Sequence, residues 1–455
     1  MSTFGNVSGR SARAARACVL VACAVLLWLA VPATASAAPT WARTWKPRSG
    51  SYTIYQVRLA PAPAGGVYVG TTPCSASHVA SGMAVARYTP GGKRLWGKLL
   101  TKASRSAVAA VAADPSGRLV VAGAAPTAAG GTKWRLLKLS RAGKVLWHTG
   151  LMGVAKAGSG PSGLSVDGAG HIYVCGAVGR SGRGSDASLA KFSAGGKLLW
   201  IRYLGGSAHG DDFATGLARD SQGHIYVAGH VSNVGTGYDA FVARYSPTGH
   251  RAWRRFWDNL STHGDDDAWA VAASSAGVAV AGSTDGAWDT GYNVYDRDGL
   301  VVSYTPSGGG RYEYTVAGTS PSGEFAAAYI DGAGNVVAAG RISTGASGSG
   351  NTKAVLLMLS PAGTEWYSSW LPIGPGDGGF EAITSRGGTL VAVGFESAGS
   401  GSDMLLHTVT PSLVTTVDSY SSGAGTTNDA TDVLCRGSAI YLAGGAGVKM
   451  GLVRF

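Results

Sequence analysis

The chain has 455 residues, a formal net charge of +12 and only 14% charged residues, and glycine fills 71 positions. A net charge of this size speaks to solubility rather than to a partner, and basic residues are not interleaved with aromatic ones as in single-strand binding proteins, so we expect no nucleic-acid partner. The five cysteines form no CxxC pair and have no metal-ligand spacing, which argues against a zinc module.

Residues 1–37 have the three parts of a secretory signal peptide. Three arginines between residues 10 and 16 precede an apolar run at 17–31, and Ala35-Ser36-Ala37 fits cleavage after small residues. Cleavage there predicts a secreted chain of net charge +9 without a transmembrane anchor. Two alternatives stay open: lipidation at a faint lipoprotein box, Leu20 to Cys23, and retention of the segment as an uncleaved anchor.

The remainder of the chain repeats one unit, which is clearest between Asp211 and Trp257. Four short alternating or β-branched runs, at 214–218, 224–228, 240–245 and 251–257, are joined by turns rich in Gly, Asp and Pro and by one variable loop. This spacing predicts four strands that pair as an antiparallel meander. A single meander buries neither of its faces, so its meaning depends on how often it recurs.

The unit recurs eight times. A glycine that we place at the end of the second strand returns at intervals of 50 to 58 residues, at Gly70, Gly123, Gly176, Gly229, Gly282, Gly340, Gly394 and Gly444. A period near fifty residues with four strands per unit is typical of propeller blades. We therefore predict an all-β fold with one domain, residues 38–455, built as a single β-propeller of eight four-stranded blades.

The two ends of the domain are expected to complete one blade together. Trp41-Ala-Arg-Thr-Trp45 is similar to the fourth strands of the repeat, whereas the last repeat stops at Phe455 before it forms a fourth strand. Pairing of these ends would remove two free sheet edges. Cys74 and Cys435 fall in the neighbouring first and last blades but at opposite ends of them, so we expect no disulfide between them.

Two side-chain types recur with the strands. An aromatic residue stands at one place in six fourth strands, at Trp96, Trp147, Trp200, Trp253, Tyr312 and Tyr367. We interpret it as an apolar plug that packs each blade on its neighbour, because aromatic rings supply much of the buried area in such contacts. Lysine and arginine recur on the third strand and the following hairpin, and we interpret their positions as solvent-facing: Arg87, Lys93, Arg94, Lys138, Lys144, Lys191, Lys197, Arg244 and Arg251.

The repeat resembles the bacterial secreted β-propeller repeat family, known as SBBP repeats. Blades three and four carry its pattern in Asp167-Gly-Ala-Gly170, Ile172-Tyr-Val-Cys-Gly176, Asp186-Ala-Ser-Leu-Ala-Lys-Phe192 and Asp239-Ala-Phe-Val-Ala-Arg-Tyr245. The family is named for seven blades and has no single known activity. The resemblance implies a propeller, secretion and a binding or scaffold role at the cell envelope or outside the cell.

A more distant likeness is to the eight-bladed quinoprotein propellers. Gly195-Gly-Lys-Leu-Leu-Trp200 is similar to their tryptophan-docking hairpin, but the Asp of that motif and an adjacent Cys-Cys pair are both missing. The likeness implies the fold and not the quinone cofactor.

One acidic constellation stands out. His209-Gly-Asp-Asp212 and His263-Gly-Asp-Asp-Asp267 occupy equivalent loops between fourth and first strands, and we place a long Asp-rich loop, 285–298, on the same face. Each Asp could cap its own turn through side-chain to backbone hydrogen bonds. Alternatively the carboxylates bind calcium, which takes six to eight oxygen ligands. The candidate calcium ligands are Asp211, Asp212, Asp265, Asp266, Asp267, Asp296 and Asp298.

The sequence carries no GxSxG, HExxH or Walker motif, and we predict no catalytic residue and no cofactor other than calcium. We therefore predict a secreted, monomeric, non-catalytic propeller that binds an envelope, glycan or protein ligand. The alternative is a propeller enzyme, a hydrolase, lyase or quinoprotein-like oxidoreductase, that uses the acidic face near the channel mouth.

Overall fold

The computed structural model describes thirteen segments of the chain: residues 39–47, 53–75, 79–128, 130–150, 160–180, 184–289, 294–317, 323–343, 352–371, 376–398, 401–421, 428–446 and 449–455. The predicted signal peptide lies outside these segments, so its cleavage stays a prediction. Residues 36–455 form one compact unit. None of the described residues forms a helix long and apolar enough to span a membrane.

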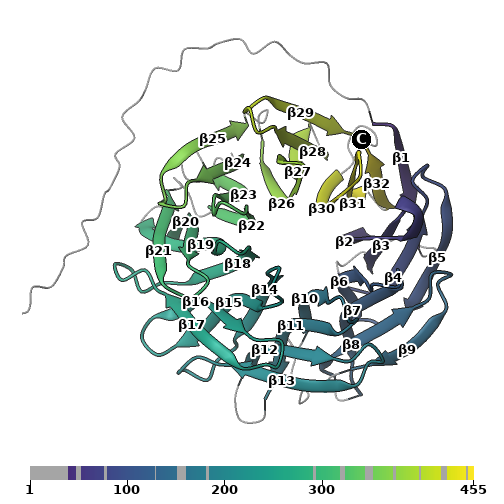
Figure 1. Ribbon diagram of the computed structural model, residues 1–455, viewed down its shortest axis with the longest axis horizontal. Helices are drawn as coiled ribbons and strands as arrows, with labels where there is room; N and C mark the ends of the chain where they lie inside the picture. Colours follow the sequence, from purple (N-terminus) through teal and green to yellow (C-terminus); the bar gives the residue numbers. More distant parts are fainter. Residues whose placement is uncertain are drawn as a thin grey trace, which may run out of the picture. The chain divides into compact units, whose positions relative to one another are not determined.

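The unit is a ring of eight four-stranded antiparallel sheets, as predicted (Figure 1). Blades 1 to 4 each consist of four consecutive strands. Blade 1 has β2 (Thr53–Pro61), β3 (Val67–Cys74), β4 (Met83–Tyr88) and β5 (Arg94–Thr101), and blade 2 has β6 (Ala107–Ala113), β7 (Leu119–Pro126), β8 (Thr132–Leu139) and β9 (Val145–Thr149). Blade 3 has β10 (Gly160–Val166), β11 (Ile172–Gly179), β12 (Ser185–Phe192) and β13 (Leu198–Leu204), and blade 4 has β14 (Phe213–Arg219), β15 (Ile225–Asn233), β16 (Gly237–Tyr245) and β17 (Arg251–Trp257).

Blades 5 to 7 are built in the same way, and blade 8 combines both ends of the domain. Blade 5 has β18 (Asp266–Ala273), β19 (Val278–Asp289), β20 (Val294–Tyr304) and β21 (Gly310–Val316), and blade 6 has β22 (Glu324–Ile330), β23 (Val336–Ser343), β24 (Thr352–Leu359) and β25 (Glu365–Leu371). Blade 7 has β26 (Gly378–Arg386), β27 (Thr389–Ala398), β28 (Gly401–Val409) and β29 (Thr415–Tyr420), and blade 8 has β30 (Asn428–Arg436), β31 (Ala439–Ala446), β32 (Lys449–Arg454) and β1 (Trp41–Trp45).

The second and third strands of several blades run further than the sequence predicted. In blade 5 the segment 285–298, predicted as a loop, belongs largely to β19 and β20, with Asp285 opposite Arg297 and Asp289 opposite Val294. The prediction of a long loop was wrong, because the backbone N–H and C=O groups of this segment pair with each other and extend the hairpin.

The recurring glycine lies inside the second strand rather than at its end. It pairs with the first-strand residue that precedes a β-bulge, as Gly229 does with Ala214. A Cβ at Gly229 would lie 1.9 Å from the carbonyl oxygen of Phe213, so only glycine allows the two strands to come this close. In blade 1 the register shift lies between Ile54 and Val57, and Gly70 pairs with Arg58, which follows the shift instead of preceding it.

Each fourth-strand aromatic packs on the next blade, which confirms the interpretation as an inter-blade plug. A Cβ at Gly143 of blade 2 would lie 2.9 Å from the ring of Trp96 in blade 1, and Gly143 has a φ of 80°. The indole N–H of Trp96 donates to the carbonyl of Arg141 in the same hairpin, at 2.9 Å. The same docking joins Trp147 to Gly196, Trp200 to Gly249, Trp253 to Gly308 and Tyr312 to Gly363.

The basic hairpin residues, such as Lys93, Lys144 and Lys197, are exposed as interpreted, whereas Lys138 and Lys191 on the third strand are buried, so for these two the interpretation was wrong. Lys138 and Lys191 are 3% and 8% exposed. Their ammonium groups donate to hairpin carbonyls of the next blade, Lys138 to Ala194 at 3.2 Å and Lys191 to Pro247 at 3.1 Å. Lys138 also pairs with Asp114 at 2.7 Å. Long basic side chains can bury their apolar stems while the charged end finds hydrogen-bond acceptors, and here those acceptors are on the neighbouring blade.

The ring is closed by β1 and β32, as predicted. The register runs from Trp41 opposite Arg454 to Trp45 opposite Met450. Trp41 then docks on blade 1, where its indole N–H donates to the carbonyl of Pro90 at 3.0 Å. Cys74, Cys175 and Cys435, the cysteines in the described part of the chain, form no disulfide with one another, and strand pairing and packing close the ring there.

Removal of the Trp41 ring is expected to destabilise the whole domain. Trp41 is 9% exposed and fills the contact between blades 8 and 1. Trp41→Ala should lower the free energy of unfolding by about 3–5 kcal/mol, as for other buried large-to-small changes. Denaturant titration measures the loss. The matched control is Trp366→Ala, because Trp366 is 47% exposed on β25. Equal losses in the two variants would contradict the closing role of Trp41.

Blade 7 carries one buried histidine at a core position. His407 on β28 is 1% exposed, its Nδ1 lies 3.1 Å from the carbonyl oxygen of Thr416, and its ring stacks on Phe380. Because a carbonyl can only accept, Nδ1 carries the proton of a neutral ring. Burial lowers the pKa of His407 to about 4.

This histidine predicts a loss of stability in acid. The unfolded chain takes up a proton near pH 6.5 and the folded chain only near pH 4, so stability is complete above pH 6.5 and falls as the pH drops from 6.5 to 4. The shift corresponds to about 3 kcal/mol. His407→Leu, which copies Leu357 of blade 6, should flatten this part of the pH–stability curve, whereas His148→Leu, at an exposed position on β9, should not. Parallel curves for wild type and His407→Leu would refute the assignment.

Candidate functional site

A cavity of about 730 Å³ lies among the innermost strands, and all eight blades line it. The bulge in each first strand explains this arrangement, because a bulge leaves one residue unpaired and re-aims its side chain. In every blade a residue inside this register shift lines the cavity. We call these eight residues the bulge ring: Gln56, Ala109, Ser162, Thr215, Trp269, Ala326, Glu381 and Thr431.

Small members of the bulge ring also hold neighbouring blades together. The hydroxyl of Ser162 donates to the carbonyl of Ala214 at 2.5 Å, and that of Thr215 donates to the carbonyl of Ala268 in the next blade. The hydroxyl of Thr431 donates to the carbonyl of Val57 at 3.0 Å, across the closure between blades 8 and 1. These hydroxyl protons are therefore used within the ring.

The three large members of the bulge ring come from different blades. Gln56 lies in blade 1, Trp269 in blade 5 and Glu381 in blade 7. The indole N–H of Trp269 donates to the hydroxyl of Ser283 at 3.2 Å, which holds the indole in place. Glu381 has no hydrogen-bond or ion-pair partner among the residues that the structure describes. Its carboxylate is thus available to a ligand in the cavity.

The charged lining comes from blades 6, 7, 8 and 1. Glu324 and Arg341 form an ion pair at 2.6 Å. Burial raises the pKa of Glu381, and the negative charges of Glu324 and Asp429 raise it further, whereas Arg341 and Arg58 oppose the rise. Burial also raises the pKa of Asp429. Blades 2 to 4 add only small uncharged groups here, so the cavity has a charged side and an uncharged side.

Arg58 is fixed in this lining by its neighbours. Its Nε donates to the carbonyl of Ala109 in blade 2 at 3.2 Å, and Nη1 donates to the carbonyl of Thr431 in blade 8 at 3.2 Å. The guanidinium therefore bridges three blades, and its charge stands at a defined point of the cavity wall.

The acidic loops predicted from the sequence lie between blades 3 and 4 and between blades 4 and 5. Several of their carboxylates cap backbone groups. Asp211 accepts from the N–H of Ser185 at 2.7 Å, Asp212 from that of Ser232 at 2.7 Å, and Asp265 from that of Tyr238 at 3.1 Å. Burial raises the pKa of Asp212 to about 6. These three contacts reach backbone N–H groups 20 to 27 residues away, so the carboxylates join neighbouring strands and loops rather than cap their own turns.

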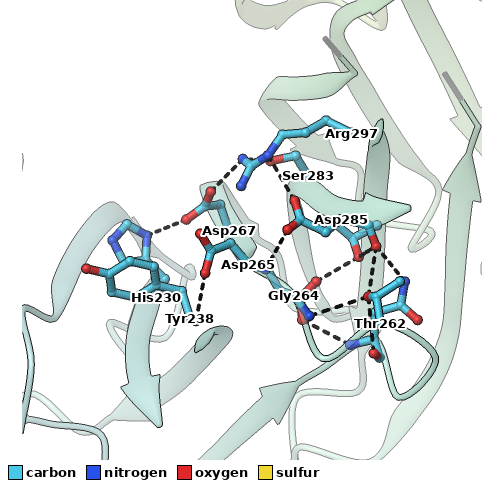
Figure 2. A network of polar contacts seen from close by, with 12 residues as sticks. His230, Tyr238, Thr262, Gly264, Asp265, Asp267, Ser283, Asp285 and Arg297 are labelled. Atoms are coloured by element: carbon cyan, nitrogen blue, oxygen red, sulfur yellow. Dashed lines mark hydrogen bonds and ion pairs between the residues drawn. The ribbon is translucent and has the colours of Figure 1, made fainter. Parts of the chain in front are cut away.

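Asp267 belongs to an ion-pair network, shown in Figure 2. Its two oxygens lie 2.7 Å from Nη1 of Arg297 and 2.7 Å from Nδ1 of His230, and Arg297 also reaches Asp285 at 3.3 Å. Although burial opposes ionisation, the hydrogen bonds and charges of His230 and Arg297 hold the pKa of Asp267 below its usual value. The charge of this carboxylate is therefore already balanced by protein groups.

The other candidate ligands are placed differently. Asp266 is fully buried and accepts from the hydroxyl of Thr284 at 2.7 Å. Asp298 lies on β20 opposite Thr284 in the backbone register. The backbone of Asp296 is part of β20, but its side chain is outside the described ones. Of the seven predicted residues, Asp211, Asp212 and Asp265 accept from backbone N–H groups, Asp267 belongs to an ion-pair network, Asp266 is buried beside Thr284, and Asp296 and Asp298 stand on β20. Calcium binding stays a prediction.

Sequence reasoning missed the bulge ring, although the sequence carries a signal for it. In blades 2 to 8 the bulge residue stands 13 or 14 positions before the recurring glycine, as Thr215 does before Gly229. The residue type varies at this position while the surrounding strand pattern repeats. A variable position at a fixed offset in a repeat is a candidate for ligand contact, because the repeat itself supplies the scaffold.

Comparison with known families confirms the resemblance to the secreted propeller repeats. The family model of the SBBP β-propeller repeat matches residues 199–230, and that of a β-propeller domain of unknown function, DUF5122, matches residues 221–250. Both matches fall on β13 to β16, where the repeat pattern is clearest. No curated protein matches the chain.

Solved structures with a similar arrangement share little sequence with this chain. The β-propeller domain of the Trilobed protease from Pyrococcus furiosus is 10% identical over 82% of this chain and 94% of its own, with a TM-score of 0.40. A puromycin hydrolase is 14% identical over 88% of this chain and 58% of its own, with a TM-score of 0.45. A gluconolactonase from Xanthomonas campestris is 13% identical over 77% and 94%, with a TM-score of 0.34.

Proposed function

We propose that this protein is a secreted, non-catalytic binding module that holds a small hydroxyl-rich ligand of the saccharide class, such as the end of a glycan, at the bulge ring. The observation that carries the proposal is the convergence of eight bulge residues, one from each blade, on one cavity of about 730 Å³. This volume lies within the range of small-molecule sites, about 300–1,000 Å³.

The chemistry of the lining supports a hydroxyl-rich ligand. Trp269 offers an aromatic face held by its bond to Ser283, and aromatic rings contribute binding through apolar contact with flat ligand surfaces. Glu381, Arg58 and Arg341 add charged acceptors and donors from blades 7, 1 and 6. Hydroxyl groups both donate and accept, so they can satisfy a carboxylate and a guanidinium in the same cavity.

The charged groups also allow a test of the enzyme alternative. The raised pKa of Glu381 is the property of a general acid, and it is the one observation that favours a hydrolase. However, Glu324, the other glutamate in the lining, is paired with Arg341 at 2.6 Å. A binding module requires only an available Glu381 and a fixed Trp269, and we therefore favour binding.

Secretion is supported by two observations. Residues 1–37 have the pattern of a cleavable signal peptide, and the SBBP repeat that matches residues 199–230 is typical of secreted proteins.

The ligand proposal predicts that two cavity substitutions weaken binding without unfolding the ring. A glycan array identifies the best saccharide, and calorimetric titration then measures its Kd for each variant. Trp269→Ala and Glu381→Gln should each weaken binding by about tenfold or more, because each removes a contact worth at least about 1.4 kcal/mol. Trp366→Ala on the outer strand should leave the Kd unchanged.

Two outcomes would contradict this proposal. If no saccharide binds, the ligand class is wrong. If the bound saccharide is converted, and Glu381→Gln stops conversion while it preserves binding, the protein is an enzyme and Glu381 is its acid.

The secretion proposal predicts a defined mature N-terminus. When the full chain is expressed in a bacterial host, the exported protein should begin at Ala38, as measured by intact mass. Leu26→Arg in the apolar run should keep the protein inside the cells, because a charge there disrupts the signal segment. Recovery of an exported chain that still carries residues 1–37, or a lipid on Cys23, would show that the cleavage prediction is wrong.

A further inference from the structure

Three carboxylates meet at the junction between blades 4 and 5, outside the bulge ring. Asp239 stands on β16, Asp258 directly follows β17, and Asp266 begins β18. One carboxylate oxygen from each residue lies within 4.8 Å of the others. The backbone register explains the approach of the first two, because Ala240 pairs with Trp257 and each Asp is adjacent to one of these residues.

Two of the three carboxylates have an enclosed oxygen without a protein partner. Asp239 is 6% exposed, and its Oδ2 accepts from the side chain of Asn233 at 2.6 Å while its Oδ1 is buried and unpaired. Oδ2 of Asp258 lies 2.9 Å from Nδ1 of His263, and its Oδ1 is likewise buried and unpaired. A buried acceptor without a partner is costly, so these two oxygens call for a ligand that the protein does not supply.

The charge of the cluster is not balanced by the protein either. Within the part of the chain that the structure describes, no Lys or Arg forms an ion pair with Asp239, Asp258 or Asp266. His263 contacts Asp258, with Nδ1 2.9 Å from Oδ2. Clustered carboxylates repel one another unless a cation or a proton lies among them.

We propose that Asp239, Asp258 and Asp266 bind one calcium ion at the junction of blades 4 and 5. Calcium binds oxygen at 2.3–2.6 Å, so two ligands of one ion lie at most about 5 Å apart, which the cluster satisfies. Magnesium requires a near-ideal octahedron and gives up its water ligands reluctantly, whereas calcium accepts irregular sets of carboxylate oxygens, so calcium is the better match. Water completes the coordination, since three carboxylates supply at most six of the six to eight oxygens that calcium takes.

The preceding junction contains a natural control. Asp186 and Asp212, between blades 3 and 4, are the counterparts of Asp239 and Asp266. Gly205 stands where Asp258 stands one blade later, because Leu204 and Trp257 occupy equivalent register positions. Asp186 is also paired with Arg180 at 3.5 Å. The proposed site therefore differs from the preceding junction in two ways: it has a third carboxylate, Asp258, and its Asp239 has no described arginine partner like Arg180.

The experiment titrates the metal-free, full-length mature chain with calcium by calorimetry and follows its thermal unfolding with calcium or with chelator. Wild type should bind one calcium ion per chain, and its Tm should rise by a few degrees at a hundredfold excess over Kd. Asp258→Asn, which keeps the size of the side chain, and Asp258→Gly, which copies Gly205, should each weaken calcium binding by at least about tenfold. Asp211→Asn, an exposed cap in the preceding junction, is the control and should bind calcium as wild type does.

The result has three informative outcomes. Equal Tm values of wild type and Asp258→Asn in chelator show that the variant is folded, so that its loss of calcium binding supports the site. Absence of heat and of any Tm change in wild type would overturn the proposal and assign the neutralising role to a proton. Calcium binding that survives Asp258→Asn and Asp258→Gly but is lost in Asp211→Asn would overturn it in favour of the preceding junction.

Discussion

The ring depends on the contact of an outer-strand aromatic with a hairpin glycine of the next blade. The glycine has a positive φ and lies against the aromatic side chain, so a Cβ there would come within about 3 Å of the indole, as at Gly92 and Trp41. The indole N–H and the third-strand cation reach hairpin carbonyls at the same place, as Trp253 and Arg244 do at Pro306. Blades 1, 2 and 4 thus each position the next blade through one apolar and two polar contacts.

The exception to this contact has a clear cause. Blade 8 joins β32 to β1 from the opposite end of the chain, so it has no hairpin between its third and fourth strands. An aromatic in the outer strand of blade 7 would have no such glycine to contact, and Val417 occupies that position, 47% exposed. In blade 7 itself the hairpin residue is Leu413, with a φ of 60°, which is a strained conformation for a side chain of that size. The valine at position 417 therefore follows from the way in which the ring closes, whereas closure does not explain Leu413.

Periodicity in the sequence was enough to predict the number of blades, the four strands of each and the pairing of Trp41–Trp45 with the last strand. It was not enough for the direction of side chains. Lys138 alternates like a surface residue, yet the neighbouring blade covers it, and no local pattern reports a contact between residues 56 positions apart. Thr215 and Glu381 reach the cavity because a bulge shifts them out of the pleat, and a two-residue alternation does not reveal a bulge. For the acidic loops the sequence predicted Asp266 as a ligand but not Asp258. Asp258 stands out only when the blades are aligned by their strand register, because Gly205 occupies the equivalent position of the preceding blade.

The last blade also imposes an order on folding. β1 is the first and β32 the last of the described strands along the chain, and the backbone of Trp41 pairs with that of Arg454. Bringing such distant ends together costs chain entropy, and the cost is met only when the seven intervening blades have shortened the gap. A nascent chain that lacks its C-terminal residues therefore holds an unpaired β1 and an open blade 8. Chaperones and proteases can recognise such an unpaired strand edge. Only a chain that has all of these strands folds into a propeller without it.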